Sequence, residues 1–270
     1  MKKLLFGALA LLLLTNFAVA QQTETIKEKE EAKKSTKNKN YNYNNWNNWG
    51  GGERVVGEGP SVSETRDVKN FTGFKSSISA DITVKQTSGN FNVTIEGQKN
   101  IIALVKCEVV DGTLKIGFEK GYSINHKEPL KIHIEAPSFS YMGMSGSGNV
   151  RSKSGLTGEK LTVNISGSGD FDLNDLKFNN LNVGISGSGD IDLAGSVESV
   201  ELSISGSGDL NAENLKAQKA QCRVSGSGDI SLNVSKELDA SISGSGDISY
   251  SGKPATVHKR VSGSGDIVSK

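Results

Sequence analysis

The residues of this chain that could do chemistry recur at a regular interval in its second half. The pentapeptide SGSGD begins at Ser166, and SGSGN precedes it at Ser145. Five later copies of SGSGD begin at Ser186, Ser205, Ser225, Ser243 and Ser262. Glycines beside hydroxyl and carboxylate groups occur in loops that hold phosphates and in loops that hold metal ions. The motif could therefore be a binding site, or it could be part of the scaffold.

The motif does not fit a phosphate-binding loop. Such a loop needs its glycines where a strand meets a helix, so that the helix amides point at the anion. Each SGSGD copy is instead followed by a strand-like segment such as FDL or IDL, and no lysine follows the glycines.

The aspartates of the motif suggest a cation site. They occupy equivalent places in successive copies, which predicts a single outward column. Neighbouring carboxylates about 5 Å apart repel by about 1 kcal/mol even at the dielectric constant of water, and bound Ca²⁺ would relieve that repulsion. The known calcium roll, however, has a nine-residue period that this chain lacks. The column consists of Asp170, Asp190, Asp209, Asp229, Asp247 and Asp266.

A structural role for these aspartates is the alternative that we favour. Each carboxylate could accept a hydrogen bond from its own backbone at a bend. Asn149 in the first copy supports this interpretation, because asparagine can make the same bond without a charge. Calcium is kept as the alternative, and no other cofactor is expected.

Histidine and cysteine give no catalytic constellation. His126, His133 and His258 are scattered, and His133 alternates within KIHIE as an ordinary strand residue would. Cys107 and Cys222 lack metal-ligand spacing, and whether they pair is left open. Cys222 stands where other copies have valine or leucine, which predicts a buried thiol. We expect no catalytic residue.

The alternation of apolar residues predicts how the motif is positioned. In LTVNISGSGDFDL the apolar residues and both glycines share one parity, whereas the serines and the aspartate share the other. If the strand is unbroken, glycine faces inward, where it permits a sharp bend or lets the backbone approach the opposite wall, and serine and aspartate form a flat outward face. That face is the candidate ligand surface. Its serine ladder comprises Ser168, Ser188, Ser207, Ser227 and Ser245.

The spacing of the copies predicts the architecture. From serine to serine the intervals are 21, 20, 19, 20, 18 and 19 residues, which is typical of a solenoid. We expect an all-β protein whose strand-rich N-terminal half continues into a stacked parallel β-helix of about seven coils, wound right-handed. The variable segments, such as NDLKFNN and NVSKE, are predicted to be loops.

Four regions follow from this pattern. Residues 1–20 resemble a signal peptide, and residues 21–52 form a low-complexity tether that we expect to be disordered. Residues 53–144 form the N-terminal β part, with hairpins expected around Ser88-Gly89-Asn90 and Asp111-Gly112, a strand at PLKIHIEAP and no helix. Residues 145–270 form the repeat.

Charge and leader together limit the location and the partners. The net charge of +1 and the scattered basic residues argue against nucleic acid as a partner. No stretch of the mature chain has transmembrane length. We expect export to the periplasm or cell surface of a Gram-negative bacterium, or secretion.

The chain resembles the family of auto-transporter adhesin head GIN domains, known from exported Gram-negative proteins. The resemblance covers roughly residues 66–270 and rests on RDVKNFTGFKSSISADITVKQ, VTIEGQKNIIALVKCEVVDGTLKIGF and PLKIHIEAPSFSYMGMSGSGNV, followed by the repeats. It implies an all-β fold with β-helical stacking and a role in adhesion. The family supplies no catalytic or ligand residue that could be carried over.

We therefore expect an exported, non-enzymatic β-helical protein, either adhesin-like or structural, in the cell envelope. Its partner would be a surface or cell-wall polysaccharide or another envelope protein, because a repetitive face suits a repetitive ligand. One alternative is a carbohydrate-active β-helix enzyme, a polysaccharide lyase or hydrolase, although the short variable segments leave little room for a cleft. The other is a purely architectural envelope protein.

Overall fold

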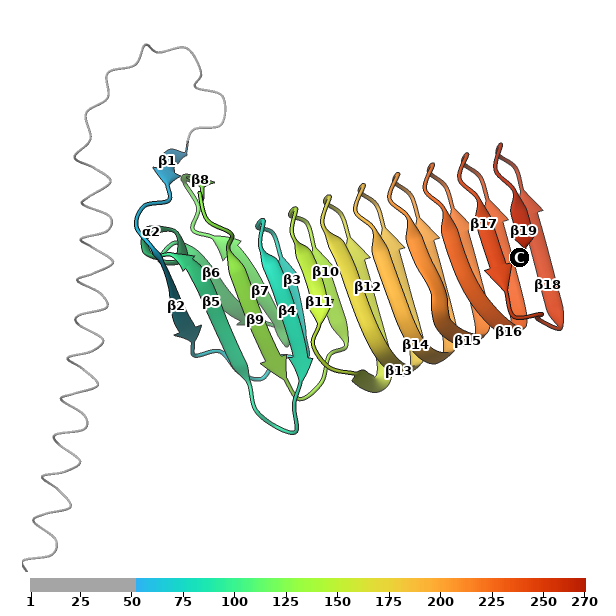
Figure 1. Ribbon diagram of the computed structural model, residues 1–270, viewed down its shortest axis with the longest axis horizontal. Coiled ribbons are helices and arrows are strands. Elements are labelled where there is room, and N and C mark those ends of the chain that lie inside the picture. Colours follow the sequence, from blue (N-terminus) through green and yellow to red (C-terminus); the bar gives the residue numbers. More distant parts are fainter. Residues whose placement is uncertain (1–51) are drawn as a thin grey trace, which may run out of the picture.

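The computed structural model describes residues 52–270, which form an elongated all-β body (Figure 1). The predicted signal peptide and nearly all of the predicted tether lie outside the described residues. One sheet of 17 strands runs the length of the body, and a second sheet has two strands. None of the helices within residues 52–270 has the length and apolar character needed to cross a membrane.

The second half is a stack of parallel strands, as the repeat predicts. Equivalent strands of successive coils pair in parallel throughout this half, from Tyr141 beside Thr162 to Tyr250 beside Ser269. The stack has about six turns, against the seven expected. Its strands are β10 (Tyr141–Met144), β11 (Asn149–Ser152), β12 (Leu156–Ile165), β13 (Asp170–Ile185), β14 (Ile191–Ile204), β15 (Leu210–Val224), β16 (Ile230–Ile242), β17 (Ile248–Ser251), β18 (Thr256–Val261) and β19 (Ile267–Ser269).

Each coil has three sides, which can be followed in the burial pattern of β13. Buried and outward residues alternate along this strand, but two adjacent residues are exposed at 174–175 and again at 179–180. Each such pair shifts the inward parity by one residue, which marks a corner. The third corner is the SGSG segment, where the strand is interrupted. The inward side chains of this coil are Phe171, Leu173, Leu176, Phe178, Leu181, Val183 and Ile185.

The variable segments are not loops, so that prediction was wrong. NDLKFNN lies wholly within β13, and its residues Leu176 and Phe178 are buried in the core. Differences in coil length are absorbed by shifts of strand register at the corners, for example between Leu173 and Leu176 where β13 pairs with β14. The segment can therefore vary in length and still contribute to the core.

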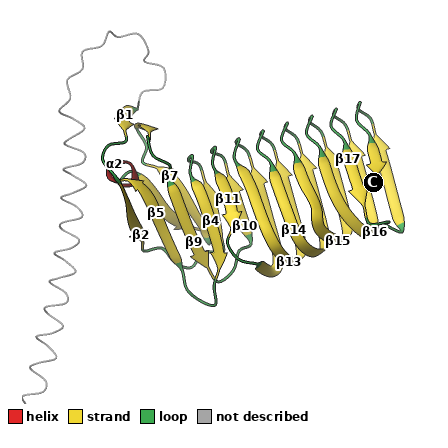
Figure 2. Cartoon of the chain, in the orientation of Figure 1, coloured by secondary structure: helices red, strands yellow, loops and turns green. Residues whose placement is uncertain are grey.

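The first half carries the same stack further and covers its end. The parallel stack includes β3 (Gly73–Ser76), β4 (Asp81–Gln86), β7 (Thr113–Phe118) and β9 (Lys131–Ala136). Three antiparallel strands are added to it: β5 (Asn92–Gln98) on β9, β2 (Ser61–Arg66) on β5, and β6 (Val105–Val110) on β7. Short elements complete this end: β1 (Glu53–Val56), α2 (Lys99–Ile102) and β8 (Tyr122–Asn125). Figure 2 shows the antiparallel strands gathered at one end of the body.

The order of coils in space differs from their order in the chain. The coil made by β3 and β4 lies between β7/β9, which follow it in sequence, and β10/β11. Its corner, SISAD at residues 77–81, is stacked against SGSGN of the next coil. SISAD is thus an earlier copy of the motif, and the hydrogen bonding runs on across the expected boundary between residues 144 and 145.

The local predictions for the first half had mixed outcomes. The hairpin at Asp111-Gly112 is confirmed, with β6 antiparallel to β7 and both turn residues at positive φ. The strand expected at PLKIHIEAP is β9. The hairpin expected at Ser88-Gly89-Asn90 was wrong, because β9 lies between β4 and β5. The short helix α2 was not expected.

Candidate functional site

The SGSG segments form a row of bends along one edge of the solenoid. Each interrupts the chain between two strands, and the bends project as a line of narrow tips (Figure 1). The predicted serine ladder is exposed throughout: Ser168, Ser188, Ser207, Ser227 and Ser245. The surface is a convex ridge, however, and the expectation of a flat face was wrong because the strand breaks at the motif.

The glycines of the motif are required by the neighbouring coil. A Cβ built on Gly187 would lie 1.9 Å from the carbonyl oxygen of Gly167, and one on Gly189 would lie equally close to that of Gly169. The motif glycines are not among those with left-handed φ, so backbone conformation does not explain them. Of the two roles expected for these glycines, the bend is present, whereas the close approach is to the preceding coil and not to the opposite wall. It allows the Ser188 N–H to donate to the Gly167 carbonyl at 3.0 Å.

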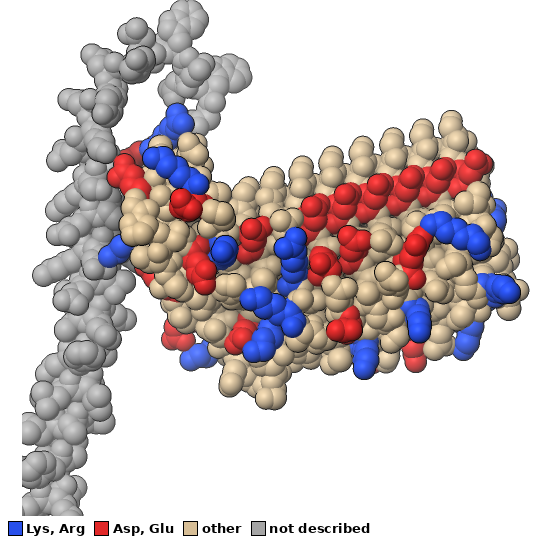
Figure 3. Space-filling view, viewed as in Figure 1, with Lys and Arg blue, Asp and Glu red and all other residues tan. Residues whose placement is uncertain are grey.

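The six aspartates form the predicted column, and their carboxylates bond from coil to coil (Figure 3). Each is exposed, and all but the last accept a hydrogen bond from the backbone N–H of the next aspartate along the chain. We expected each carboxylate to accept a hydrogen bond from the backbone of its own bend. That prediction was wrong, because the donor is the backbone N–H of the next coil. The bonds are Asp190 N to Asp170 Oδ1 at 2.9 Å, Asp209 to Asp190 at 2.8 Å, Asp229 to Asp209 at 2.8 Å, Asp247 to Asp229 at 2.7 Å and Asp266 to Asp247 at 2.7 Å.

This bonding gives the acidic column a structural role. Stacked carboxylates repel, but a charge-assisted hydrogen bond to a backbone N–H offsets part of that repulsion. Within residues 52–270 no group of three or more histidine, cysteine or acidic residues is placed to hold a metal ion. Calcium on the column stays a prediction.

A groove crosses four coils on the short side of the solenoid, which is the side formed in β13 by residues 176–178, and no sequence pattern indicated it. Its volume is about 670 Å³. Lys177, Ser196, Lys216 and Asn233 stand at one register on successive strands β13 to β16 and point outward into it. The lining is completed by Phe178, Asn179, Val197, Glu198, Ala217, Gln218 and Ser235.

The groove combines a repeating polar lining with an apolar floor. Phe178, Val197 and Ala217 are almost fully buried beneath it, so they present only a narrow apolar strip. Lys177 and Lys216 lie two coils apart, a separation of about 9.6 Å given strand spacing of about 4.8 Å. The segments that build this side are those expected to be loops, which is why sequence reasoning missed the groove.

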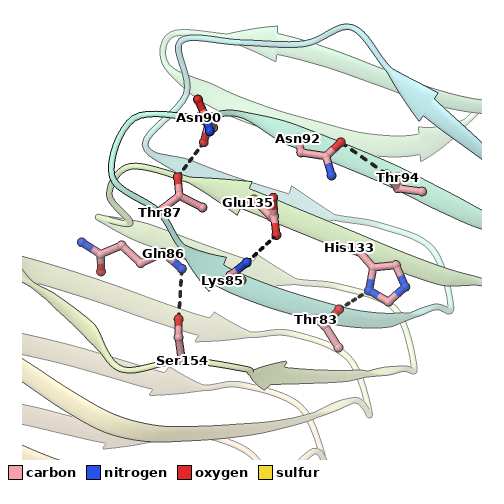
Figure 4. A network of polar contacts seen from close by, with 10 residues as sticks. All are labelled: Thr83, Lys85, Gln86, Thr87, Asn90, Asn92, Thr94, His133, Glu135 and Ser154. Atoms are coloured by element: carbon pink, nitrogen blue, oxygen red, sulfur yellow. Dashed lines mark hydrogen bonds and ion pairs between the residues drawn. The ribbon is translucent and has the colours of Figure 1, made fainter.

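A second polar cluster lies on the outward face of β4, β9 and β5. The Thr83 hydroxyl contacts Nδ1 of His133, and Nε2 of His133 lies 3.3 Å from Glu96 Oε1. Figure 4 shows Thr83 and His133 side by side on neighbouring strands, next to the Lys85–Glu135 ion pair of 3.1 Å. Sequence reasoning missed this cluster because Thr83 and His133 meet only through the pairing of β4 with β9.

The order hydroxyl, imidazole, carboxylate is that of an acyl-transfer triad. A triad also needs a substrate cleft and donors for an oxyanion. The grooves found on the described residues are lined by other side chains. The arrangement is accounted for as a cross-strand polar cluster that ties three strands together. Of the other two histidines, His126 contacts the Glu128 carbonyl oxygen at 3.1 Å, and His258 is exposed.

Both cysteines are free and are poor nucleophiles. Burial raises the pKa of the Cys107 thiol to about 11 and that of Cys222 to about 12. The predicted burial of Cys222 is confirmed, since its side chain lies in the solenoid core. Thiols with such raised pKa values stay protonated at neutral pH and are unreactive.

Comparisons with known proteins agree with this fold. The family model described as "Putative auto-transporter adhesin, head GIN domain" matches residues 70–254. A crystal structure of a putative adhesin from Bacteroides fragilis is similar, with 29% identity, a TM-score of 0.78, and coverage of 80% of this chain and 100% of that one. No curated protein matches the chain significantly.

Two further solved structures are similar. A putative lipid binding protein from Parabacteroides distasonis is 25% identical with a TM-score of 0.68, covering 80% of this chain and 99% of that one. A putative adhesin from Parabacteroides merdae, at 24% identity, has the same coverage and a TM-score of 0.59, a likeness of fold.

Proposed function

Because the chain belongs to the family of putative auto-transporter adhesin head GIN domains, we propose that it is an exported, non-enzymatic adhesin-like module of the cell envelope. We further propose that it holds a linear glycan in the groove that crosses β13 to β16. The adhesin-like relatives and the predicted leader support export, to the periplasm or to the cell surface.

The observation that carries the glycan proposal is the repetition inside the groove. Four successive strands present one outward side chain each at a single register: Lys177, Ser196, Lys216 and Asn233. A ligand that repeats along its own length can meet such a row with equivalent groups at each step. A folded globular partner would gain little from this translational repeat.

The chemistry of the lining points to an anionic glycan. Two lysines two coils apart can each pair with a carboxylate or sulfate group on alternate units of an extended polymer. Serine, asparagine and glutamine supply donors and acceptors for sugar hydroxyls. The strip above Phe178, Val197 and Ala217 offers apolar contact to the faces of sugar rings.

A lipid ligand, suggested by the printed name of the Parabacteroides distasonis relative, is less well supported in this chain. A lipid tail needs an apolar surface, and among residues 52–270 the exposed large hydrophobic side chains are Val261 and Val268, far from the groove in the chain. The groove itself is open, and eight of its eleven lining residues are polar or charged.

Calorimetric titration with linear oligosaccharides tests the proposal. The panel contains uronic-acid and sulfated glycans and their neutral counterparts. We expect an anionic glycan to bind and the double variant Lys177→Ala/Lys216→Ala to lose at least about tenfold in affinity, which is about 1.4 kcal/mol. The matched control is Lys131→Ala/Lys153→Ala, which removes two exposed lysines outside the groove. Absence of binding across the panel, or equal loss in both double variants, would contradict it.

Two further measurements separate the alternatives. New reducing ends that accumulate during incubation with an acidic polysaccharide would indicate the carbohydrate-active enzyme. Proteolysis of intact cells tests exposure, because adhesion requires an accessible protein. Complete protection would leave a periplasmic or purely architectural role.

A further inference from the structure

The last described coil carries a charged residue at a position that faces the core. In β18 the residues Val257, Lys259 and Val261 pair with Leu238, Ala240 and Ile242 of β16. These three partners are fully buried or nearly so. Lys259 therefore occupies the inward register. Earlier coils have apolar residues at this level of the core: Val183, Leu202, Cys222 and Ala240.

The contacts of Lys259 place its side chain across the end of the core. The Lys259 ammonium donates a hydrogen bond of 2.9 Å to the carbonyl oxygen of Ile267, which lies on β19 beyond the tip. The same ammonium lies 4.8 Å from the centroid of the Tyr250 ring, a cation–π contact. The aliphatic stem thus spans from one side of the last coil to the other, with the charge at the solvent boundary.

Among residues 52–270, no further coil is stacked on the end that Lys259 crosses. Of residues 52–270, the exposed large hydrophobic side chains are Val261 at 49% and Val268 at 48%, both in this coil. Its strands β18 and β19 are paired on one side only, with β16 and β17. An exposed strand edge beside apolar side chains is a template for pairing with another chain.

The other end of the solenoid restricts which partner could use this template. There the antiparallel strands β2, β5 and β6 cover the stack, so a second copy cannot continue the coils head to tail. Two copies could share this template only by joining their C-terminal ends, related by a two-fold axis. Such a contact would be closed after two subunits.

We propose that Lys259 is a stop residue that keeps this end from pairing with a second copy of the chain. Pairing would bury the ammonium group and bring it close to that of the partner. An inward-pointing charge on an edge strand opposes such association, because the charge would lose its hydration without gaining an opposite charge. Replacing it by the apolar residue of the other coils would complete the hydrophobic end and allow dimers. This inference does not depend on the glycan proposal.

Arg260 offers a matched control. It is the next residue on the same strand and carries the same charge, but it points outward and forms an ion pair of 3.1 Å with Asp239. Arg260→Val removes a positive charge and adds the same apolar side chain as Lys259→Val, but it leaves the inward-facing residue unchanged.

Sedimentation velocity of the full chain over a hundredfold range of concentration tests the proposal. We expect the wild-type protein and Arg260→Val to remain monomers and Lys259→Val to shift toward a dimer with rising concentration. Lys259→Met, which keeps the length of the stem, should dimerise as well and provides a second variant if valine impairs folding. Lys259→Arg should remain a monomer. A wild-type dimer, monomeric Lys259 variants that unfold in urea like the wild type, or equal dimerisation of Arg260→Val would overturn the proposal.

Discussion

The Oδ1 atom of Asp170 accepts a hydrogen bond of 2.9 Å from the backbone N–H of Asp190, one coil later. The same bond recurs down the column to Asp266. The carboxylates therefore fasten consecutive coils together next to the tips. The residue type is explained by this bond, because a short side chain with an oxygen acceptor reaches the neighbouring N–H.

Removing one such acceptor should weaken the stack. Asp209→Ala leaves the N–H of Asp229 without its 2.8 Å partner, and we expect a loss of about 1–2 kcal/mol in the free energy of unfolding. Asp209→Asn keeps an oxygen acceptor and removes charge repulsion, so its loss should be smaller, about 0.5 kcal/mol or less. Urea unfolding measures both. Equal losses would show that the charge, and not the acceptor, matters.

The same column allows a direct test of calcium binding. If the carboxylates are satisfied by backbone bonds, millimolar calcium should leave the melting temperature unchanged. Thermal melts with calcium and with a chelator make the comparison, and magnesium serves as the ionic control. An upward shift that is specific to calcium and is reduced in Asp209→Asn would favour the cation alternative.

Two glycines three residues apart should respond very differently to alanine. At Gly187 the new Cβ would lie 1.9 Å from the Gly167 carbonyl oxygen, which is fixed by the stack. At Gly184 it would meet, at 2.8 Å, the side-chain Oδ1 of Asn164, which can move away. We expect Gly187→Ala to cost at least about 2 kcal/mol and Gly184→Ala about 1 kcal/mol or less, measured by urea unfolding. A tolerated Gly187→Ala would contradict the close approach of the tips.

Cys222 should make the protein less stable at alkaline pH. Burial raises its pKa from 9.0 to about 12, so above pH 9 the unfolded chain releases a proton that the folded chain retains. The unfolded state then binds fewer protons, and the free energy of unfolding falls as pH rises from about 9 to about 12. Between pH 9 and pH 10 this contribution is about 1 kcal/mol. Cys222→Val should reduce the slope, and an unchanged slope would argue against burial as the cause.

The Thr83–His133 contact should be structural and not catalytic. Thr83→Val keeps the shape of the side chain but removes the hydroxyl that contacts the imidazole. We expect hydrolysis of activated esters at the buffer rate by both proteins, and a loss of about 1 kcal/mol in unfolding free energy for the variant. Turnover in the wild type that disappears in Thr83→Val would make the cluster an active site.

Much of the solenoid follows from patterns within one repeat. The inward parity of residues such as Leu181 and Ile185, the burial of Cys222 and the outward aspartates are local properties of a twenty-residue unit. They could be predicted because a strand exposes alternate residues, and each copy of a repeat has the same inward and outward positions.

The remaining features depend on contacts between distant segments. Strand β9 separates β4 from β5 although it begins more than thirty residues after β5 ends, so the turn at Ser88-Gly89-Asn90 looked like a hairpin. SISAD could not be predicted as a copy of the motif, because Ile78 and Ala80 occupy the glycine positions. The coil next to it in space is also distant in sequence. The groove could not be predicted because it lies on the side between two corners. Two adjacent polar residues at each corner break the alternation, so the segment has the sequence pattern of a loop.

The corner shifts that absorb differences in coil length have a consequence for how this protein can change in evolution. Leu181, Val200, Ala220 and Leu238 stack in register although the intervals between them are 19, 20 and 18 residues. A recombination that joins equivalent points of two coils would place β13 directly against β15, with the tips and the side that contains Leu181 still aligned. The solenoid can therefore become longer or shorter by whole coils through duplication or deletion. The loss of a single residue within a tip, in contrast, would disturb the stack.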